Sequence, residues 1–146
     1  MNAATTNGST KITPAAWFTP IAGAALIWNL MGVAAFISQM MTDLSILPEA
    51  QRAYYASIPL WATAAFAIAV FAGAAGSTGL LLKKRWAFPV LIVSFIGILV
   101  QLAHSLLLGN GVEVFGRSAL ILPLLTLAIG LALIGLADLA KKRNWI

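Results

Sequence analysis

Four apolar segments, each long enough to cross a lipid bilayer, constrain this chain more than any other feature of its sequence. They run from about 20 to 41, 59 to 82, 87 to 108 and 118 to 140. About 20 helical residues, rising 1.5 Å each, cross a bilayer core about 30 Å thick. The four segments hold no charged residue before Asp138, near the end of the last. Because lipid cannot pair with backbone N–H and C=O groups, such segments must form helices.

The composition supports the same class of protein. Hydrophobic residues make up 61% of the chain and charged residues 9%, against about 25% charged in a soluble domain. We therefore predict an all-α integral membrane four-helix bundle over residues 14–146, preceded by a polar, disordered tail over residues 1–13. The first apolar segment exceeds the about 7–15 residues of a signal-peptide core, so we expect it to be retained.

The basic residues are distributed unevenly between the two ends of the predicted helices. One end carries two cations and three acids, namely Arg52, Arg117, Asp43, Glu49 and Glu113. The other end carries seven cations: Lys11, Lys83, Lys84, Arg85, Lys141, Lys142 and Arg143. By the positive-inside rule the second end faces the cytoplasm, and an even number of helices then places both termini there. Tryptophans are predicted at the boundaries, with Trp17, Trp86 and Trp145 inside and Trp61 outside.

The two basic clusters, 83–85 and 141–143, are candidate binding sites for anionic lipid headgroups. The alternative is that they only fix the topology, and both roles are compatible. Asp138 is expected to pair with Lys141 three residues later. The acids and arginines of the other end are expected to form a solvated rim with one or two exposed salt bridges.

Prolines and loops predict where the helices begin and how they connect. The first helix is expected to begin at Thr19-Pro20, or earlier at Thr13-Pro14, and Pro123 predicts a bend or a late start in the fourth. Residues 47–55 predict a short amphipathic helix in the loop. The short turn 83–86 predicts a tight antiparallel hairpin of the second and third helices.

Small residues predict which helix faces meet. The second apolar segment carries a ridge made of Ala65, Ala69, Gly73 and Ser77, with Gly76 beside it. Such residues let membrane helices approach closely, so this ridge is the expected seam. The spacing Gly73-x-x-Gly76-x-x-Gly79 lies in an apolar helix and does not follow a strand, which indicates packing and not nucleotide binding.

Four polar residues inside the apolar segments are the candidate ligand-binding residues. Gln39, Gln101 and His104 are estimated to share one depth and are expected to cluster inside the bundle, where they would bind a small polar solute or bond the helices together. His104 alone is a candidate proton relay or axial ligand. Asn29, beside Trp28, would bind a ring-shaped ligand or set the packing.

Enzyme chemistry has no basis in this sequence, so we expect no enzymatic activity. The chain has no cysteine and one histidine, which leaves no thiolate nucleophile and no metal-ligand spacing. No carboxylate pair lies in the apolar segments, and we expect no cofactor and no metal. The expected partners are membrane lipids and either another membrane protein or further copies of the chain, but not nucleic acid.

Three stretches carry a resemblance to a known group of proteins. They are Trp28-Asn-Leu-Met-Gly32, residues 47–55 and residues 59–73, followed by a basic turn and the helix with Gln101. Together they resemble small proteobacterial inner-membrane proteins that are mostly uncharacterised and sometimes labelled sugar transporters. The resemblance covers about residues 25 to 105 and implies four membrane helices in a bacterial inner membrane, which is the expected location. Two functions follow from the whole sequence: a non-enzymatic accessory or structural subunit, or a small polar-solute carrier that acts as an oligomer.

Overall fold

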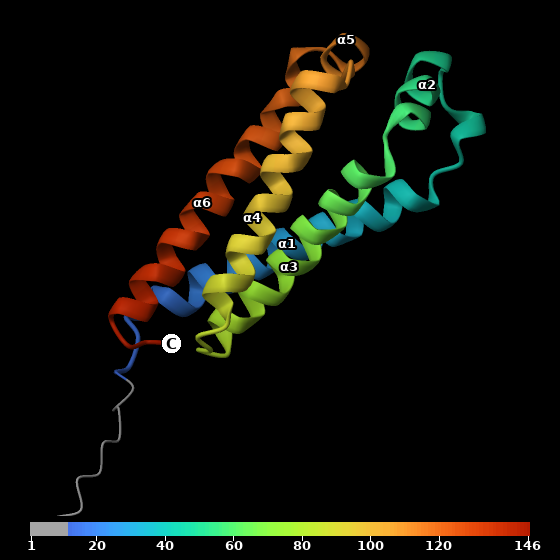
Figure 1. The fold of residues 1–146 in the computed structure, drawn as a ribbon. Helices are drawn as coiled ribbons and strands as arrows, with labels where there is room; N and C mark the ends of the chain where they lie inside the picture. Colours follow the sequence, from blue (N-terminus) through green and yellow to red (C-terminus); the bar gives the residue numbers. More distant parts are fainter. Residues whose placement is uncertain (1–11) are drawn as a thin grey trace, which may run out of the picture.

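The computed structural model describes residues 12–146, and its four long helices coincide with the four apolar segments (Figure 1). These helices are α1 (Phe18–Met41), α3 (Leu60–Leu81), α4 (Ala87–Ala103) and α6 (Ile121–Lys142). With the helical turns that adjoin α4 and α6, all four are long and apolar enough to span a membrane. The described part of the chain contains no strand. The predicted tail lies outside the described residues except for Ile12 and Thr13.

The connections hold short helices at one end of the molecule. They are the 3-10 turn η1 (Leu44–Ile46), α2 (Glu49–Ser57), α5 (Gly111–Phe115) and the 3-10 turn η3 (Arg117–Leu120). The amphipathic helix predicted over 47–55 is thus confirmed, with Pro48 directly before it. We call this end of the molecule the loop end, and the opposite end, formed by residues 82–89 and 138–146, the basic end.

The start of α1 differs from the predicted positions, whereas the start of α6 agrees with its prediction. α1 begins at Phe18, two residues before Pro20 and four after Pro14, because Phe18 N–H already donates to Ala15 in a turn. A proline in the first helical turn costs little, since its N–H would have no partner there. α6 begins at Ile121 after the η3 turn, which confirms the late start that Pro123 predicts.

The third apolar segment ends in an unpredicted π-helical turn. α4 stops at Ala103, and η2 (His104–Leu108) continues it with wider turns. Gly109 N–H closes this turn on the carbonyl of His104 at 2.8 Å. π turns are rare and their extra residue alters the direction of neighbouring side chains. The sequence pattern of the segment contains no signal that distinguishes this turn from an α-helix.

α3 is the central helix of the fold. It packs on α4 and on α1, and α6 packs on the other side of α4, so the helix contacts run in the order α1, α3, α4, α6. Nine residues of α3 are buried, including the whole predicted ridge. A Cβ on Gly76 would collide with Leu91, and a Cβ on Gly97 would meet the Ala65 carbonyl at 2.8 Å. The predicted seam and the packing role of these glycines are therefore confirmed.

The hydrophobic core is concentrated at the basic end. Phe18 and Ala22 of α1, Ala137 and Ala140 of α6, and Leu80 of α3 are each at most 1% exposed. Trp145, predicted in a boundary belt, is instead buried in this core. Its ring lies 5.5 Å from that of Phe18 and 5.6 Å from that of Trp17. The reason is that the chain turns back after α6, with φ of 53° at Asn144, and carries the indole beneath α1.

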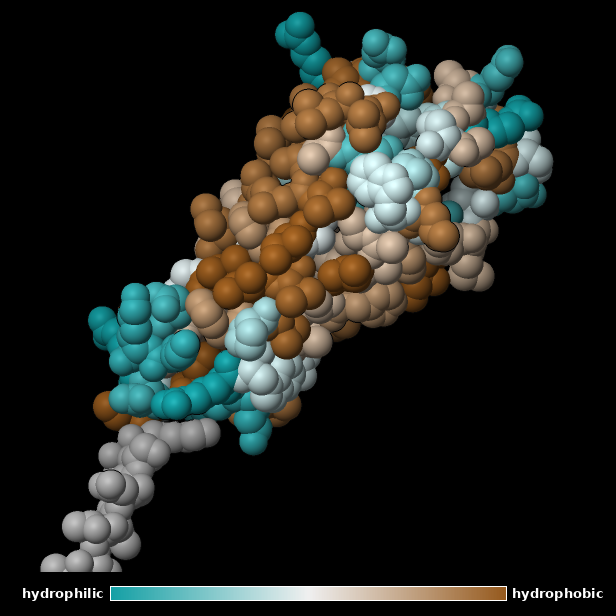
Figure 2. Space-filling model, in the orientation of Figure 1, coloured by the Kyte–Doolittle hydropathy of each residue, from teal (hydrophilic) through white to brown (hydrophobic). Residues whose placement is uncertain are grey.

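The surface of the molecule is divided into three zones. Hydrophobic residues form a broad band along the long helices, and hydrophilic residues gather at the two ends (Figure 2). The band includes exposed side chains from every long helix, for example Ile27, Ile68, Ile96 and Leu131. This distribution is compatible with a multi-pass membrane protein, because a bilayer solvates the middle of such a molecule and water its ends.

The close approach of α1 and α4 to α3 at Gly73 generates a test. A Cβ at this position would collide with Asn29 Oδ1 and lie 3.0 Å from Ser94 Oγ. We expect Gly73→Ala to lower the free energy of unfolding by about 1–3 kcal/mol, the usual cost of overpacking. The measurement is the unfolding of the purified protein in mixed micelles with increasing denaturing detergent.

Gly23→Ala is the matched control. No atom lies within 4 Å of the position that its Cβ would take, so we expect unchanged or slightly higher stability from the better helix propensity of alanine. Equal stability of the two variants would contradict the packing described at Gly73.

Candidate functional site

A layer of polar side chains crosses the middle of α1, α3 and α4. Asn29 Nδ2 donates to Ser77 Oγ at 3.1 Å and to the Ala25 carbonyl at 2.9 Å. Ser94 Oγ donates to the Ala69 carbonyl at 2.6 Å. Asn29 Oδ1 and Ser94 Oγ both lie against Gly73, the position where a larger residue would displace them. The similar depth predicted for Asn29 and Ser94 is thus confirmed, and hydrogen bonds join both α1 and α4 to α3.

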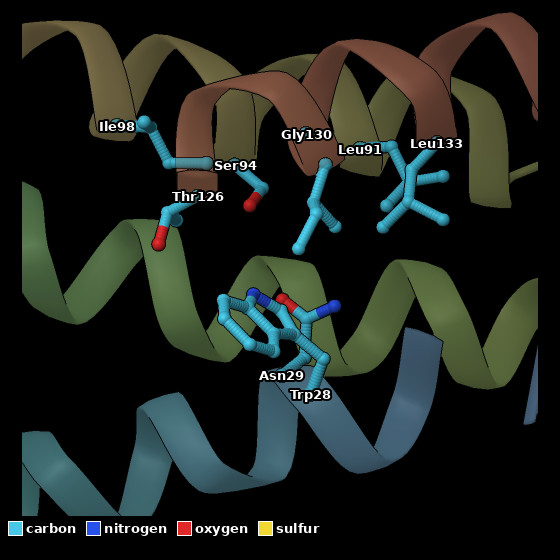
Figure 3. Close-up of a pocket in the computed structure, with 9 residues that line it drawn as sticks. Trp28, Asn29, Leu91, Ser94, Ile98, Thr126, Gly130 and Leu133 are labelled. Atoms are coloured by element: carbon cyan, nitrogen blue, oxygen red, sulfur yellow. The ribbon is translucent and has the colours of Figure 1, made fainter. Parts of the chain in front are cut away.

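A small cavity lies beside this polar layer. In Figure 3, Trp28 and Asn29 of α1 face residues of α4 and α6 across it. Its volume is about 20 Å³, which is room for about one water molecule. Its lining consists of Trp28, Asn29, Leu91, Ser94, Ile98, Thr126, Ile129, Gly130 and Leu133. A ring-shaped ligand, considered for Trp28 and Asn29, does not fit this space.

A larger pocket lies near the loop end, and it contains Gln39. Its volume is about 180 Å³, and its lining consists of Gln39, Met40, Thr42, Leu44, Tyr55, Ile58 and Thr63. Neither Gln101 nor His104 lines it, and no hydrogen bond joins any two of the three residues in the described chain. The three predicted residues therefore do not form one site, because Gln39 lies where the end of α1 meets the loop before α3.

Gln101 and His104 belong to the contact between α4 and the start of α3. His104 is 7% exposed, and its ring meets that of Trp61 edge to face with centroids 5.2 Å apart. Gln101 Oε1 is buried without a hydrogen-bond partner within the described residues. Trp61 remains 48% exposed, so it covers His104 while its outer face stays on the surface.

An aromatic cluster of Tyr54, Tyr55 and Phe115 ties α2 to α5 at the loop end. The ring of Tyr54 lies 5.5 Å from that of Tyr55 and 5.2 Å from that of Phe115. Burial raises the pKa of Tyr54, the neighbouring Tyr55 raises it further, and a hydrogen bond with Ser105 lowers it. The sequence does not predict this cluster, since it joins loops that are distant in sequence.

At both ends of the molecule, the ion pairs in the structure differ from the predicted ones. Asp138 pairs with Lys142 at 2.6 Å, one turn away, and not with Lys141. Lys141 instead lies over the ring of Phe88, 5.0 Å from its centroid. No salt bridge links the acids and arginines of the loop end in the described structure. Hydrogen bonds from Ser45, first from its side chain and then from its N–H at 2.8 Å, lower the pKa of Asp43.

All six cations predicted to contact headgroups are exposed at the basic end: Lys83, Lys84, Arg85, Lys141, Lys142 and Arg143. Arg85 Nε donates to the main-chain oxygen of Ile146 at 3.3 Å, and its Nη2 donates to Asn144 Oδ1 at 3.4 Å. The α3–α4 turn is thereby fastened to the chain that follows α6. Two clusters 55 or more residues apart in sequence share one end of the fold.

Comparison with known proteins finds no matching family model, no matching curated protein and no matching solved structure. The structure itself defines the class: an all-helical chain in its described part, with four helices long and apolar enough to span a membrane. Within the described residues, no group of three or more histidines or acids is placed to hold a metal ion.

The environment of Tyr54 predicts its titration. Because the neutral phenol is favoured in the folded protein, its pKa lies above the usual 10.0. The corresponding stability is present below pH 10 and is lost as the pH rises through the raised pKa. Phenolate absorbance of the wild type minus that of Tyr54→Phe should show one step above pH 10. Tyr55→Phe, which retains Tyr54, is the control, and a difference step at or below pH 10 would contradict the buried position of Tyr54.

Proposed function

We propose that this chain is a small, non-enzymatic accessory or structural subunit of a bacterial inner membrane, with both termini in the cytoplasm. It packs there against another membrane protein or against further copies of itself. The observation that supports the proposal is that the polar residues inside the apolar band bond the helices to one another. Asn29 and Ser94 are engaged in hydrogen bonds to α3, and the cavity beside them has room for about one water. Such residues support packing and not a path for a solute.

The uncovered faces of α1 and α6 support an interaction role. The buried residues of α1 are Phe18, Ala22 and Ala25, and those of α6 are Leu133, Ala137 and Ala140, all toward the basic end. Over the rest of its length α6 packs mainly on α4. Small residues on its exposed side, Ala128, Ala132 and Gly135, permit close approach of a further helix.

The proposed orientation rests on the charges. Six described cations lie at the basic end together with a single acid, Asp138. The loop end carries Arg52 and Arg117 with the other three acids. This asymmetry supports a cytoplasmic basic end by the positive-inside rule.

The alternative function is transport of a small polar, sugar-like solute by an oligomer. The pocket of about 180 Å³ that holds Gln39 at the loop end favours it. Transporters usually bind their substrate near the middle of the membrane, between repeats. This pocket lies instead at the end of α1, which makes the subunit the better-supported proposal.

The test of the proposed function is the mass of the complex that the full chain forms when it is extracted from its native membrane in mild detergent. We expect an assembly larger than the 15.4 kDa monomer. Gly135→Leu should weaken this assembly about tenfold, the equivalent of about 1.4 kcal/mol. Its Cβ would meet nothing within 4 Å inside the monomer, so the fold should be retained. Ala53→Leu, on the exposed side of α2 at the loop end, is the control substitution and should leave the assembly unchanged.

Saturable sugar uptake into proteoliposomes that Gln39→Ala abolishes would overturn the subunit and favour the carrier. A monomer in mild detergent would contradict both proposals, since each requires an assembly. Asn29→Ala serves as a second variant in the uptake assay. It removes a hydrogen bond between α1 and α3 without touching the pocket at the loop end.

A further inference from the structure

The two basic clusters form one continuous surface at the basic end. Arg85 of the α3–α4 turn reaches Asn144 and Ile146 beyond α6. Lys141 of α6 lies over Phe88, three residues after Arg85 in sequence. One contact joins the α3–α4 turn to the residues after α6, and the other joins the end of α6 to the start of α4. Cations of both clusters therefore lie around the junction between α4 and α6.

The cations of this surface differ in whether a neighbouring group of the protein neutralises their charge. Asp138, the only acid at this end of the chain, is paired with Lys142. Arg143 lies over the ring of Trp145, 5.6 Å from its centroid, a contact that leaves its charge uncompensated. Lys84 and Lys141 are exposed, and neither forms an ion pair within the described residues. The surface therefore carries a large positive charge with a single acid to offset it.

Apolar side chains adjoin these cations directly. Trp86 is 44% exposed and Leu82 is 58% exposed on the α3–α4 turn, and Phe88 lies under Lys141. Beyond them begins the hydrophobic band of the long helices (Figure 2). A ligand that fits this surface needs an anionic group for the cations and apolar chains for the band, which is the chemistry of an anionic phospholipid.

We propose that the basic end binds the anionic headgroup of a phospholipid between the α3–α4 turn and the end of α6. Lys84 and Lys141 supply the principal uncompensated charges. Arg85 is a positioning residue, because it fastens the turn to the residues that follow α6. The ion pair of Lys142 and Asp138 contributes little, since its net charge is zero. This binding site is independent of whether the chain is a subunit or a carrier.

The test is a titration of the full chain in neutral detergent with phosphatidylglycerol, followed by native mass spectrometry. We expect Lys84→Gln and Lys141→Gln each to weaken binding about fivefold, the equivalent of about 1 kcal/mol per cation. Lys84→Arg and Lys141→Arg, which keep the charge, should bind within about twofold of the wild type. Far-ultraviolet circular dichroism confirms that each variant retains its helices.

The double variant Asp138→Asn/Lys142→Gln is the matched control inside the cluster, because it removes the ion pair without changing the net charge. Arg117→Gln, which removes one cation at the loop end, is the second control. We expect each control to change binding less than about twofold. A loss with either control as large as that with Lys141→Gln would overturn the site, because binding would then not depend on the uncompensated cations of the basic end.

Two further outcomes decide the nature of the ligand. Phosphatidylcholine, which has a phosphate but no net charge, should bind at least about fivefold more weakly than phosphatidylglycerol, in line with about 1 kcal/mol per cation. Equal binding of the two lipids would overturn the selectivity for an anion. Displacement of phosphatidylglycerol by an equal concentration of inorganic phosphate would show that the surface binds free phosphate, and would overturn the lipid as its ligand.

Discussion

The hydrogen bonding of the backbone within four long apolar helices is the interaction on which this structure depends. In a bilayer core each unpaired N–H or C=O group costs several kcal/mol, roughly the price of transfer into an apolar solvent. Four apolar segments of sufficient length, with Asp138 near the end of the last as their single charged residue, leave the helix as the one local solution, and the structure forms a helix in each. The same constraint acts on side chains: Asn29, Ser77 and Ser94 find partners between helices. Water-accessible loops at the ends carry most of the charge.

Close packing in the centre of the molecule follows from small residues and not from large apolar ones. Lipid tails are as apolar as leucine side chains, so burying leucine between helices gains little in a membrane. Helices instead approach one another closely at Gly73, Gly76 and Gly97. Beside Gly73, the hydrogen bonds of the polar layer fix how these helices are oriented. α3 provides this surface to both neighbours, which explains its central position. α6 has fewer such contacts and keeps most of its surface uncovered.

Much of this fold is predictable from the sequence, because its signals are local. Segment length and absence of charge predict the four helices, and glycine spacing predicts the face that α3 presents. The features that are not predictable depend on long-range contacts or small energy differences. The π turn at His104 differs little in energy from an α-helical turn. The pairing of Asp138 with Lys142 likewise differs little from pairing with Lys141. The burial of Trp145 depends on a chain reversal at Asn144, and the separation of Gln39 from Gln101 depends on how α1 leaves the bundle, which helical depth alone does not describe.

The response of the protein to alkaline carbonate tests the central claim, that lipid solvates the band of apolar residues around the long helices. Carbonate strips proteins held on membranes by charge or by other proteins, but it leaves helices that span the bilayer in place. We expect the chain to sediment with the membranes after this treatment and to enter the supernatant only when detergent is added. Release of folded protein into the supernatant without detergent would contradict the account, because water would then have to solvate a surface that includes Ile27, Ile96 and Leu131.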